Sequence, residues 1–99
     1  MAVEKYTALS LVKSRLNRMA SDTSLDAYFS QRIEAAEAEL EGTGISLTDS
    51  ADDLMLVVDY TVWQYQNRDN PGSMPEWLRL RRRERWLRQR ATEGTENDS

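Results

Sequence analysis

Residues 48–66, TDSADDLMLVVDYTVWQYQ, decide the fold of this 99-residue chain. The segment begins with Asp49, Asp52 and Asp53, and carboxylates favour a helix N-terminus because they complement the helix dipole. Taken locally, its β-branched and aromatic residues could also form a strand. The acidic start and the length favour a helix, and no other segment resembles a strand that could pair with it. Because the segment is apolar on nearly all sides, we expect it to be a central helix around which the others pack.

An amphipathic helix is expected near the start of the chain, over about residues 7–19. Thr7 is its expected N-cap. Its apolar face is formed by side chains at helical spacing, namely Leu9, Val12, Leu16 and Met19.

A second amphipathic helix is expected before the central segment. Thr23 and Asp26 resemble a capping box at its start, with Asp in place of the usual Glu or Gln. Gly42 and Gly44 supply its C-terminal stop. Its apolar stripe extends over four turns and consists of Leu25, Phe29, Ile33, Ala36 and Leu40. Its acidic side chains are expected to face solvent, namely Glu34, Glu37, Glu39 and Glu41.

The last helix is expected over residues 73–90, SMPEWLRLRRRERWLRQR. Ser73 and Glu76 match a capping box, with Pro75 tolerated in the first turn. We expect the helix to end near Ala91 and the polar residues 92–99 to form a disordered acidic tail. The predicted fold class is therefore all-α: one small four-helix bundle over residues 1–91, with a long central helix and an Arg-rich C-terminal helix.

The two sides of this last helix differ in composition. One side is apolar and is expected to face the core; it consists of Met74, Trp77, Leu78, Leu80, Leu87 and Ala91. Trp86 falls on the opposite side, where no core is available to it. Around it lie Arg79, Arg82, Arg83 and Arg90. Tryptophan and arginine dominate the energetics of binding surfaces, so these five residues form the candidate partner-binding site.

Charge is divided unevenly along the chain. Residues 79–90 contain seven arginines and one glutamate, whereas the chain as a whole has a net charge of −4. Such a distribution suits head-to-tail contact between copies or docking of an acidic partner. A charged helix that only faces solvent is the simpler alternative.

Residue types suited to catalysis are scarce. The chain has no histidine and no cysteine, which removes the commonest general base, the commonest metal ligand and any disulfide. The acids at 49, 52 and 53 fit helix capping better than acid–base chemistry. Asp59 is expected at a solvent edge or capped. We therefore expect no enzyme activity, no metal and no cofactor. The longest apolar run, Leu54–Val58, is too short to span a membrane, so we expect a soluble protein.

Three kinds of partner could use the arginine face. Nucleic acid would place phosphates on the guanidinium groups and stack bases on Trp86. An acidic protein surface would pair with the same arginines. An anionic membrane is disfavoured because the apolar side of the helix is expected to face the core. The overall acidity argues against a dedicated nucleic-acid binder.

Taken in order, four features resemble one known family. They are the opening helix ALSLVKSRL (residues 8–16), the helix DAYFSQRIEAAEAELEG (26–42), the aspartate-led central helix that finishes in WQYQNR (63–68), and a proline-containing loop before a helix of Leu, Trp and Arg. Over roughly residues 5–91, the chain resembles the head–tail connector (adaptor) proteins of tailed bacteriophages and prophages.

The resemblance implies a structural role in the virion. Such adaptors are all-α proteins that assemble beneath the portal into a ring, commonly a dodecamer, and extend the DNA channel. Tail-completion proteins or the tail dock on them, and DNA passes without specific binding. Their last helix reaches toward the portal, so Arg79, Arg82, Arg83, Trp86 and Arg90 become candidate portal contacts. The expected location is the virion neck, and the host cytoplasm during assembly. The alternative is a small helical DNA-binding protein of phage packaging or regulation.

Overall fold

The computed structural model describes residues 4–69 and 72–98, with side chains as far as Thr92. Four helices make up the fold: α1 (Lys5–Arg15), α2 (Asp26–Gly42), α3 (Ala51–Gln66) and α4 (Glu76–Asp98). The described residues contain no strand. The predicted all-α class is therefore confirmed, and the segment that could locally have formed a strand is helix α3.

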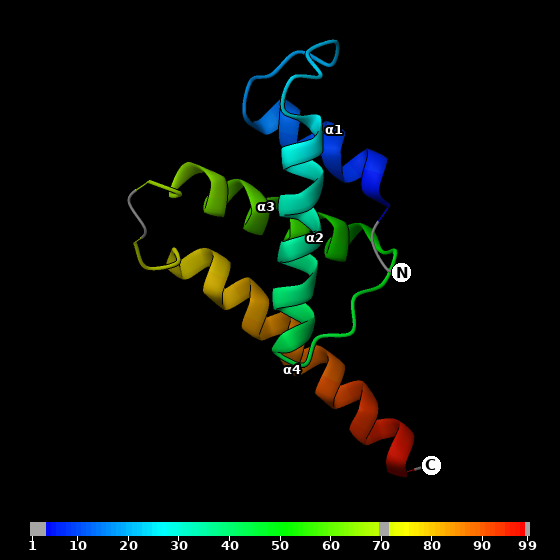
Figure 1. Cartoon of the computed structure of the whole chain (residues 1–99). Coiled ribbons are helices and arrows are strands. Elements are labelled where there is room, and N and C mark those ends of the chain that lie inside the picture. The colour runs from blue at the N-terminus through cyan, green and yellow to red at the C-terminus, as the bar shows by residue number, and fades with distance from the viewer. Residues whose placement is uncertain (1–3, 70–71, 99) are drawn as a thin grey trace.

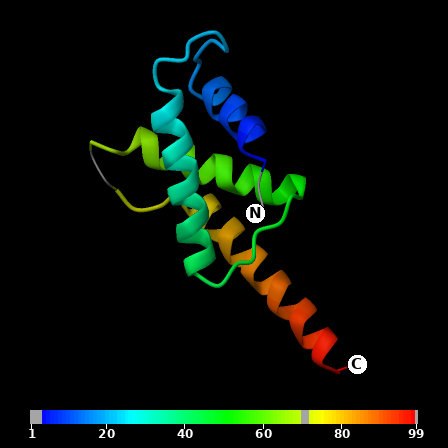
Figure 2. The ribbon, with the colours of Figure 1, turned by 45° about the vertical axis from the view of Figure 1, so that its right-hand side comes forward.

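Helix α3 lies at the centre of the arrangement. It packs against α1, α2 and α4, whereas α4 packs chiefly against α3. Figures 1 and 2 show α2 crossing α3, α1 on the far side from α4, and the second half of α4 projecting beyond the other helices. The radius of gyration is 14.6 Å, compared with about 13 Å for a compact domain of this length. The projecting part of α4 accounts for this elongation.

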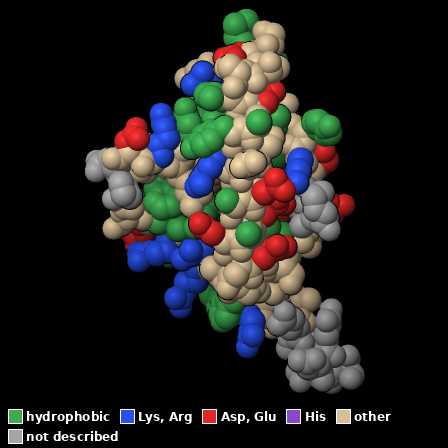
Figure 3. Space-filling model, in the orientation of Figure 1, with side chains coloured by type: hydrophobic (Ala, Val, Ile, Leu, Met, Phe, Trp, Pro, Cys, Tyr) green, Lys and Arg blue, Asp and Glu red, His purple; other side chains and the backbone are tan. Residues whose placement is uncertain are grey.

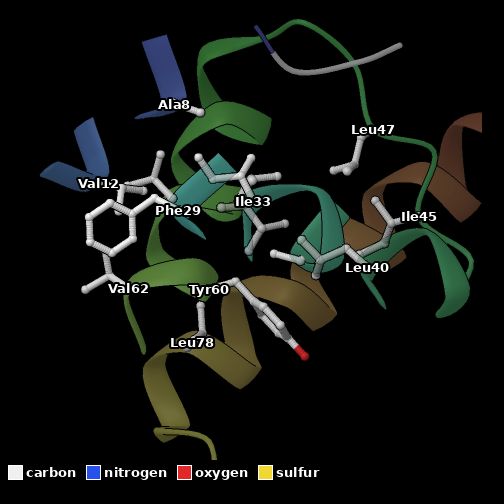
Figure 4. Close-up of a cluster of buried hydrophobic side chains, with 14 residues drawn as sticks. Ala8, Val12, Phe29, Ile33, Leu40, Ile45, Leu47, Tyr60, Val62 and Leu78 are labelled. Carbon is white, nitrogen blue, oxygen red and sulfur yellow. The ribbon is translucent and has the colours of Figure 1, made fainter. Parts of the chain in front are cut away.

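The core is drawn mainly from the first three helices. Figure 4 shows its buried side chains converging between α1, α2 and α3, with Leu78 entering from α4. The central helix contributes five of them: Leu56, Val57, Val58, Tyr60 and Val62. The stripe predicted for α2 is confirmed, because Phe29, Ile33, Ala36 and Leu40 are all buried. Leu25 packs partly buried against the same cluster.

Helix α1 begins earlier and ends earlier than expected. Glu4 is its N-cap and accepts hydrogen bonds from the backbone N–H groups of Tyr6 and Thr7, so the prediction of Thr7 as N-cap is wrong. The helix ends at Arg15 because Asn17 adopts a φ of 59°. Met19 therefore lies outside the helix and is 73% exposed.

Helix α2 begins without the predicted capping box. Leu25 occupies the N-cap position and makes no side-chain capping bond. Asp26 instead forms an ion pair with the buried Lys13, whose Nζ lies 2.9 Å from Asp26 Oδ1. The expected glycine stop is confirmed, since the helix ends at Gly42 and Gly44 has a φ of 101°. Glu37 is buried, contrary to its predicted exposure.

Helix α4 differs from its predicted span at both ends. It begins at Glu76, so Ser73 lies outside it and Pro75 precedes its first turn. The carbonyl of Pro75 accepts bonds from the N–H groups of Leu78 and Arg79. The helix continues to Asp98, so residues 92–98 extend it where we expected a disordered tail. At 1.5 Å per residue, α4 is roughly 35 Å long.

Candidate partner-binding site

Helix α4 is held on α3 largely by charge pairs. Leu78 is its one fully buried hydrophobic side chain among the described residues. One turn and two turns further on, Arg81 and Arg85 reach carboxylates of α3. Because residues 78, 81, 82, 85 and 89 recur at helical spacing, the inner face of α4 is mainly polar.

Asp53 is the more deeply buried of these carboxylates. Its side chain is 1% exposed, and it accepts bonds from Nε and Nη2 of Arg85 at 2.7 Å and 3.1 Å. It also accepts bonds from the N–H and hydroxyl of Thr48. Burial alone would raise the pKa of Asp53, but the bonds from Arg85 and Thr48 and the charge of Arg85 outweigh it and lower that pKa below its ordinary value.

Asp59 is buried between two arginines from different helices. Arg15 of α1 donates to one of its oxygens and Arg81 of α4 donates to the other. We expected this carboxylate at a solvent edge or capped; only 6% of its side chain is exposed, which excludes the solvent edge, and the two arginines cap it instead. The pairing joins α1, α3 and α4, and it explains why a carboxylate interrupts the apolar surface of α3.

The connection between α2 and α3, residues 43–50, is fastened to the same helix. Gln89 accepts a bond from the N–H of Ser46 at 2.6 Å and donates to the carbonyl of Gly44 at 2.7 Å. Arg85 donates to the carbonyl of Ser46 at 2.7 Å. The indole of Trp86 covers Gly44 so closely that a Cβ there would lie 3.0 Å from its Nε1.

The sides of α4 are therefore not those predicted from the sequence. Trp86 is partly buried against the core cluster, although we expected it to point away from the core. Trp77, Leu80 and Leu87 were expected to face the core but are 49%, 46% and 46% exposed. Ala91 is also exposed. The physical reason is that the buried carboxylates of α3 draw the arginine side of α4 inward, where those charges are neutralised.

The structure brings four of the five predicted site residues into one pocket. This pocket measures about 530 Å³ and is lined by Thr43, Arg79, Leu80, Arg82, Arg83 and Trp86. The fifth residue, Arg90, lies beside it, with its guanidinium carbon 5.3 Å from the centre of the Trp86 ring. Figure 3 shows Lys and Arg side chains gathered along the edge of the molecule where α4 runs.

The cations in this pocket are only weakly engaged within the chain. Arg79 is 3.7 Å from Glu76, both being exposed, and Arg83 forms no ion pair with the described residues. Arg82 lies near the hydroxyl of Tyr60, which donates to Glu39 at 2.7 Å. Burial, together with the bond to Glu39 and its charge, raises the pKa of Tyr60 to about 12, and Arg82 offsets only part of this rise. The pocket thus presents guanidinium groups and an indole to an anionic, partly apolar ligand.

Sequence reasoning missed three residues that shape the site. Arg85 and Gln89 belong to the same arginine-rich helix, but their role depends on Asp53 and on backbone groups of residues 43–50. Thr43 contributes through the end of α2. A buried aspartate on an apolar helix was the available signal that a cation must approach from a neighbouring helix.

Within the described residues, no helix combines the length and apolar character needed to cross a bilayer. The same residues contain no cluster of three or more His, Cys, Asp or Glu side chains that could hold a metal ion. Comparison with models of protein families, with curated proteins and with solved structures gave no match for this chain.

Proposed function

We propose that this chain is a head–tail connector (adaptor) of a tailed phage. In this role it forms a ring between the portal and the tail and extends the DNA channel. The observation that carries the proposal is a pocket of arginines and tryptophan on a helix that projects beyond the body of the bundle. A helix that projects beyond the bundle and carries weakly engaged cations is suited to reaching a second protein.

The pocket suits an acidic segment of a portal protein. Arg79, Arg82 and Arg83 offer two-point donors to carboxylates, and Leu80 and Trp86 offer apolar contact beside them. Arg90 extends the cationic rim along α4. In the proposed assembly, the tail-completion protein or the tail docks on another surface of the ring, and the virion neck is the place of action.

The internal ion pairs favour this proposal over the alternative of a DNA-binding protein. Arg81 and Arg85 are committed to Asp59 and Asp53, so they are not available to phosphates. Trp86 is partly buried and covers Gly44, which limits the stacking of a base on its ring. DNA in the channel is therefore proposed to pass without specific binding.

Capture from phage-producing cells tests the proposal. The tagged chain is pulled down with and without nuclease, and bound proteins are identified for the natural sequence, Arg83→Glu and Arg18→Glu. Arg18 is the matched control because it lies far from the pocket along the chain and pairs only loosely with Asp22, at 3.7 Å. We expect the natural sequence and the Arg18→Glu control to capture portal protein even after nuclease treatment. Arg83→Glu should no longer capture it.

Two results would contradict the adaptor role. Capture that disappears on nuclease treatment would favour the DNA-binding alternative, which also predicts a steep loss of affinity with salt. Equal capture of portal protein by Arg83→Glu and by the natural sequence would show that the pocket does not contact the portal protein.

A further inference from the structure

An apolar stripe on the outer side of α4 is left half exposed by the residues that the structure describes. Trp77, Leu80 and Leu87 lie on it, and about half of each side chain is exposed. Their spacing places them on one broad face, opposite the side that carries Leu78 and Arg85. Arg83 and Arg88 flank this face. Among the described residues, Arg88 pairs only with Asp52, at 3.6 Å between Nη1 and Oδ2, and both side chains are exposed.

The outer face of α2 has the opposite character. It lies opposite the buried stripe of that helix and exposes Ala27, Gln31, Glu34, Ala38 and Glu41. Ala27 and Ala38 are small, so a second helix can approach this face closely. Figure 3 shows acidic side chains gathered beside α2, away from the basic edge along α4.

Glu41 is a further sign that a cation belongs on α2. It lies in the last turn of the helix, where a negative charge opposes the helix dipole, and that turn contains no basic residue. Glu41 is exposed and forms no ion pair with the described residues. A guanidinium group from outside would relieve this unfavourable placement.

We propose that the outer face of α4 docks on the outer face of α2 of a second copy of this chain. Large side chains on one helix meet small ones on the other, and arginines meet Glu41 and Glu34, the latter already paired with Lys5 at 2.9 Å between Nζ and Oε1. Glu84 interrupts the α4 stripe, and the side-chain amide of Gln31 offers it a donor. Like faces do not satisfy this arrangement, because two α4 faces bring arginines together and two α2 faces bring glutamates together.

A contact between two different faces repeats from copy to copy. Such a head-to-tail contact generates a ring where the rotation closes and a filament where it does not. The inference rests on the proposed adaptor function for its closure into a ring, but the contact itself belongs to the chain alone. It also uses side chains outside the pocket proposed for the portal, apart from Leu80 and Arg83, which border both.

Sedimentation velocity of the full chain at low salt tests the contact. Leu87→Glu blocks the α4 face and Ala38→Arg blocks the α2 face; circular dichroism establishes that both variants fold. We expect the natural chain to associate beyond dimers, and each variant alone to associate about tenfold or more weakly. An equimolar mixture of the two should form a dimer and nothing larger, because only one intact pair of faces remains.

Three outcomes would overturn the inference. They are a natural chain that stays monomeric, a Leu87→Glu variant that associates like the natural chain, and an Ala38→Arg variant that still associates alone. The last would indicate pairing between α4 faces. If capture of portal protein persists in any of these cases, the adaptor proposal stands and this contact between copies is wrong. If the chain self-associates as expected but captures no portal protein, the contact stands and the adaptor proposal is wrong.

Discussion

Arg85 and Asp53 form a two-point ion pair in the interior of the molecule, through which α4 is joined to α3. Nε of Arg85 lies 2.7 Å from Oδ1 of Asp53, and the two side chains are 12% and 1% exposed. Removing one member of a buried pair leaves an uncompensated charge, which costs far more than losing a surface pair.

Replacement of Arg85 should therefore destabilise the fold strongly. We expect Arg85→Ala to lower the free energy of unfolding by about 3–5 kcal/mol. The control, Arg83→Ala, removes an arginine that forms no ion pair with any residue the structure describes, and it should change the free energy of unfolding by less than about 0.5 kcal/mol. Urea denaturation followed by circular dichroism measures both. Equal effects of the two substitutions would show that the ion pair with Asp53 does not stabilise the fold.

The same carboxylate predicts acid sensitivity. The pKa of Asp53 is lower in the folded chain than its ordinary value of about 3.9. Its contribution to stability is therefore fully present above that ordinary value, and it is lost as pH falls through the folded pKa. The unfolding free energy of the natural chain should fall more steeply on acidification below about pH 4 than that of Asp53→Asn. Parallel pH profiles for the two proteins would contradict this account.

Tyr60 should ionise late. Its folded pKa of about 12 lies above an unfolded value of about 10, so the stability it contributes is lost as pH rises from the unfolded value toward the folded one. Ultraviolet absorbance of tyrosinate should show a step near pH 12 that is missing in Tyr60→Phe. Glu39→Gln should move the step to lower pH, because the Glu39 carboxylate holds the proton on the hydroxyl. A step that Glu39→Gln leaves unmoved would assign the shift to burial alone.

Two glycines only two residues apart should respond oppositely to alanine. Gly44 has a φ of 101°, and a Cβ added there would lie 3.0 Å from Nε1 of Trp86. Gly44→Ala should therefore lower the free energy of unfolding by about 1–3 kcal/mol. Gly42 ends helix α2 with open space around it, and Gly42→Ala should be neutral or stabilising by up to about 1 kcal/mol. Chemical denaturation compares the pair, and a neutral Gly44→Ala would mean that the indole does not lie against this turn.

Of the two tryptophans of α4, Trp86 should contribute more to the stability of the fold than Trp77. Trp86→Ala removes a partly buried ring and should lower the unfolding free energy by about 1–3 kcal/mol. Trp77→Ala removes a ring that is 49% exposed and should cost less than half as much. Thermal and urea unfolding of both variants measure the difference, and a reversed order would restore the orientation predicted from the sequence.

Periodicity predicted most of the fold because three helices bury apolar stripes. Phe29, Ile33 and Leu40 repeat at helical spacing, and their burial against α3 follows directly from that pattern. Helix starts were predicted less well. Thr7 and Thr23 are suitable capping residues, but capping depends on where the backbone turns, and Glu4 supplies the cap of α1 instead.

The orientation of α4 could not be derived from its own sequence. Its leucines and tryptophans favoured an apolar inner side, but its position depends on where Asp53 and Asp59 lie on another helix. Four of the five candidate site residues still came together, because Arg79, Arg82, Arg83 and Trp86 share one side of the helix whichever way it is turned. Whether they bind a portal protein stays a prediction.

The polar attachment of α4 gives it a thermodynamic signature of its own. Among the residues whose side chains the structure describes, thirteen of the fourteen core side chains precede residue 63, and α4 supplies only Leu78. Separation of α4 from the bundle would hydrate carboxylates and guanidinium groups and expose chiefly Leu78 and Trp86 among its apolar side chains, so its heat-capacity change would be small beside that of unfolding the core. The attachment of this helix should therefore vary little with temperature, whereas the stability of the core follows the curved temperature dependence of apolar burial. Because Asp53 and Asp59 are shielded from solvent, salt should weaken this attachment less than it weakens an exposed pair such as that between Arg88 and Asp52.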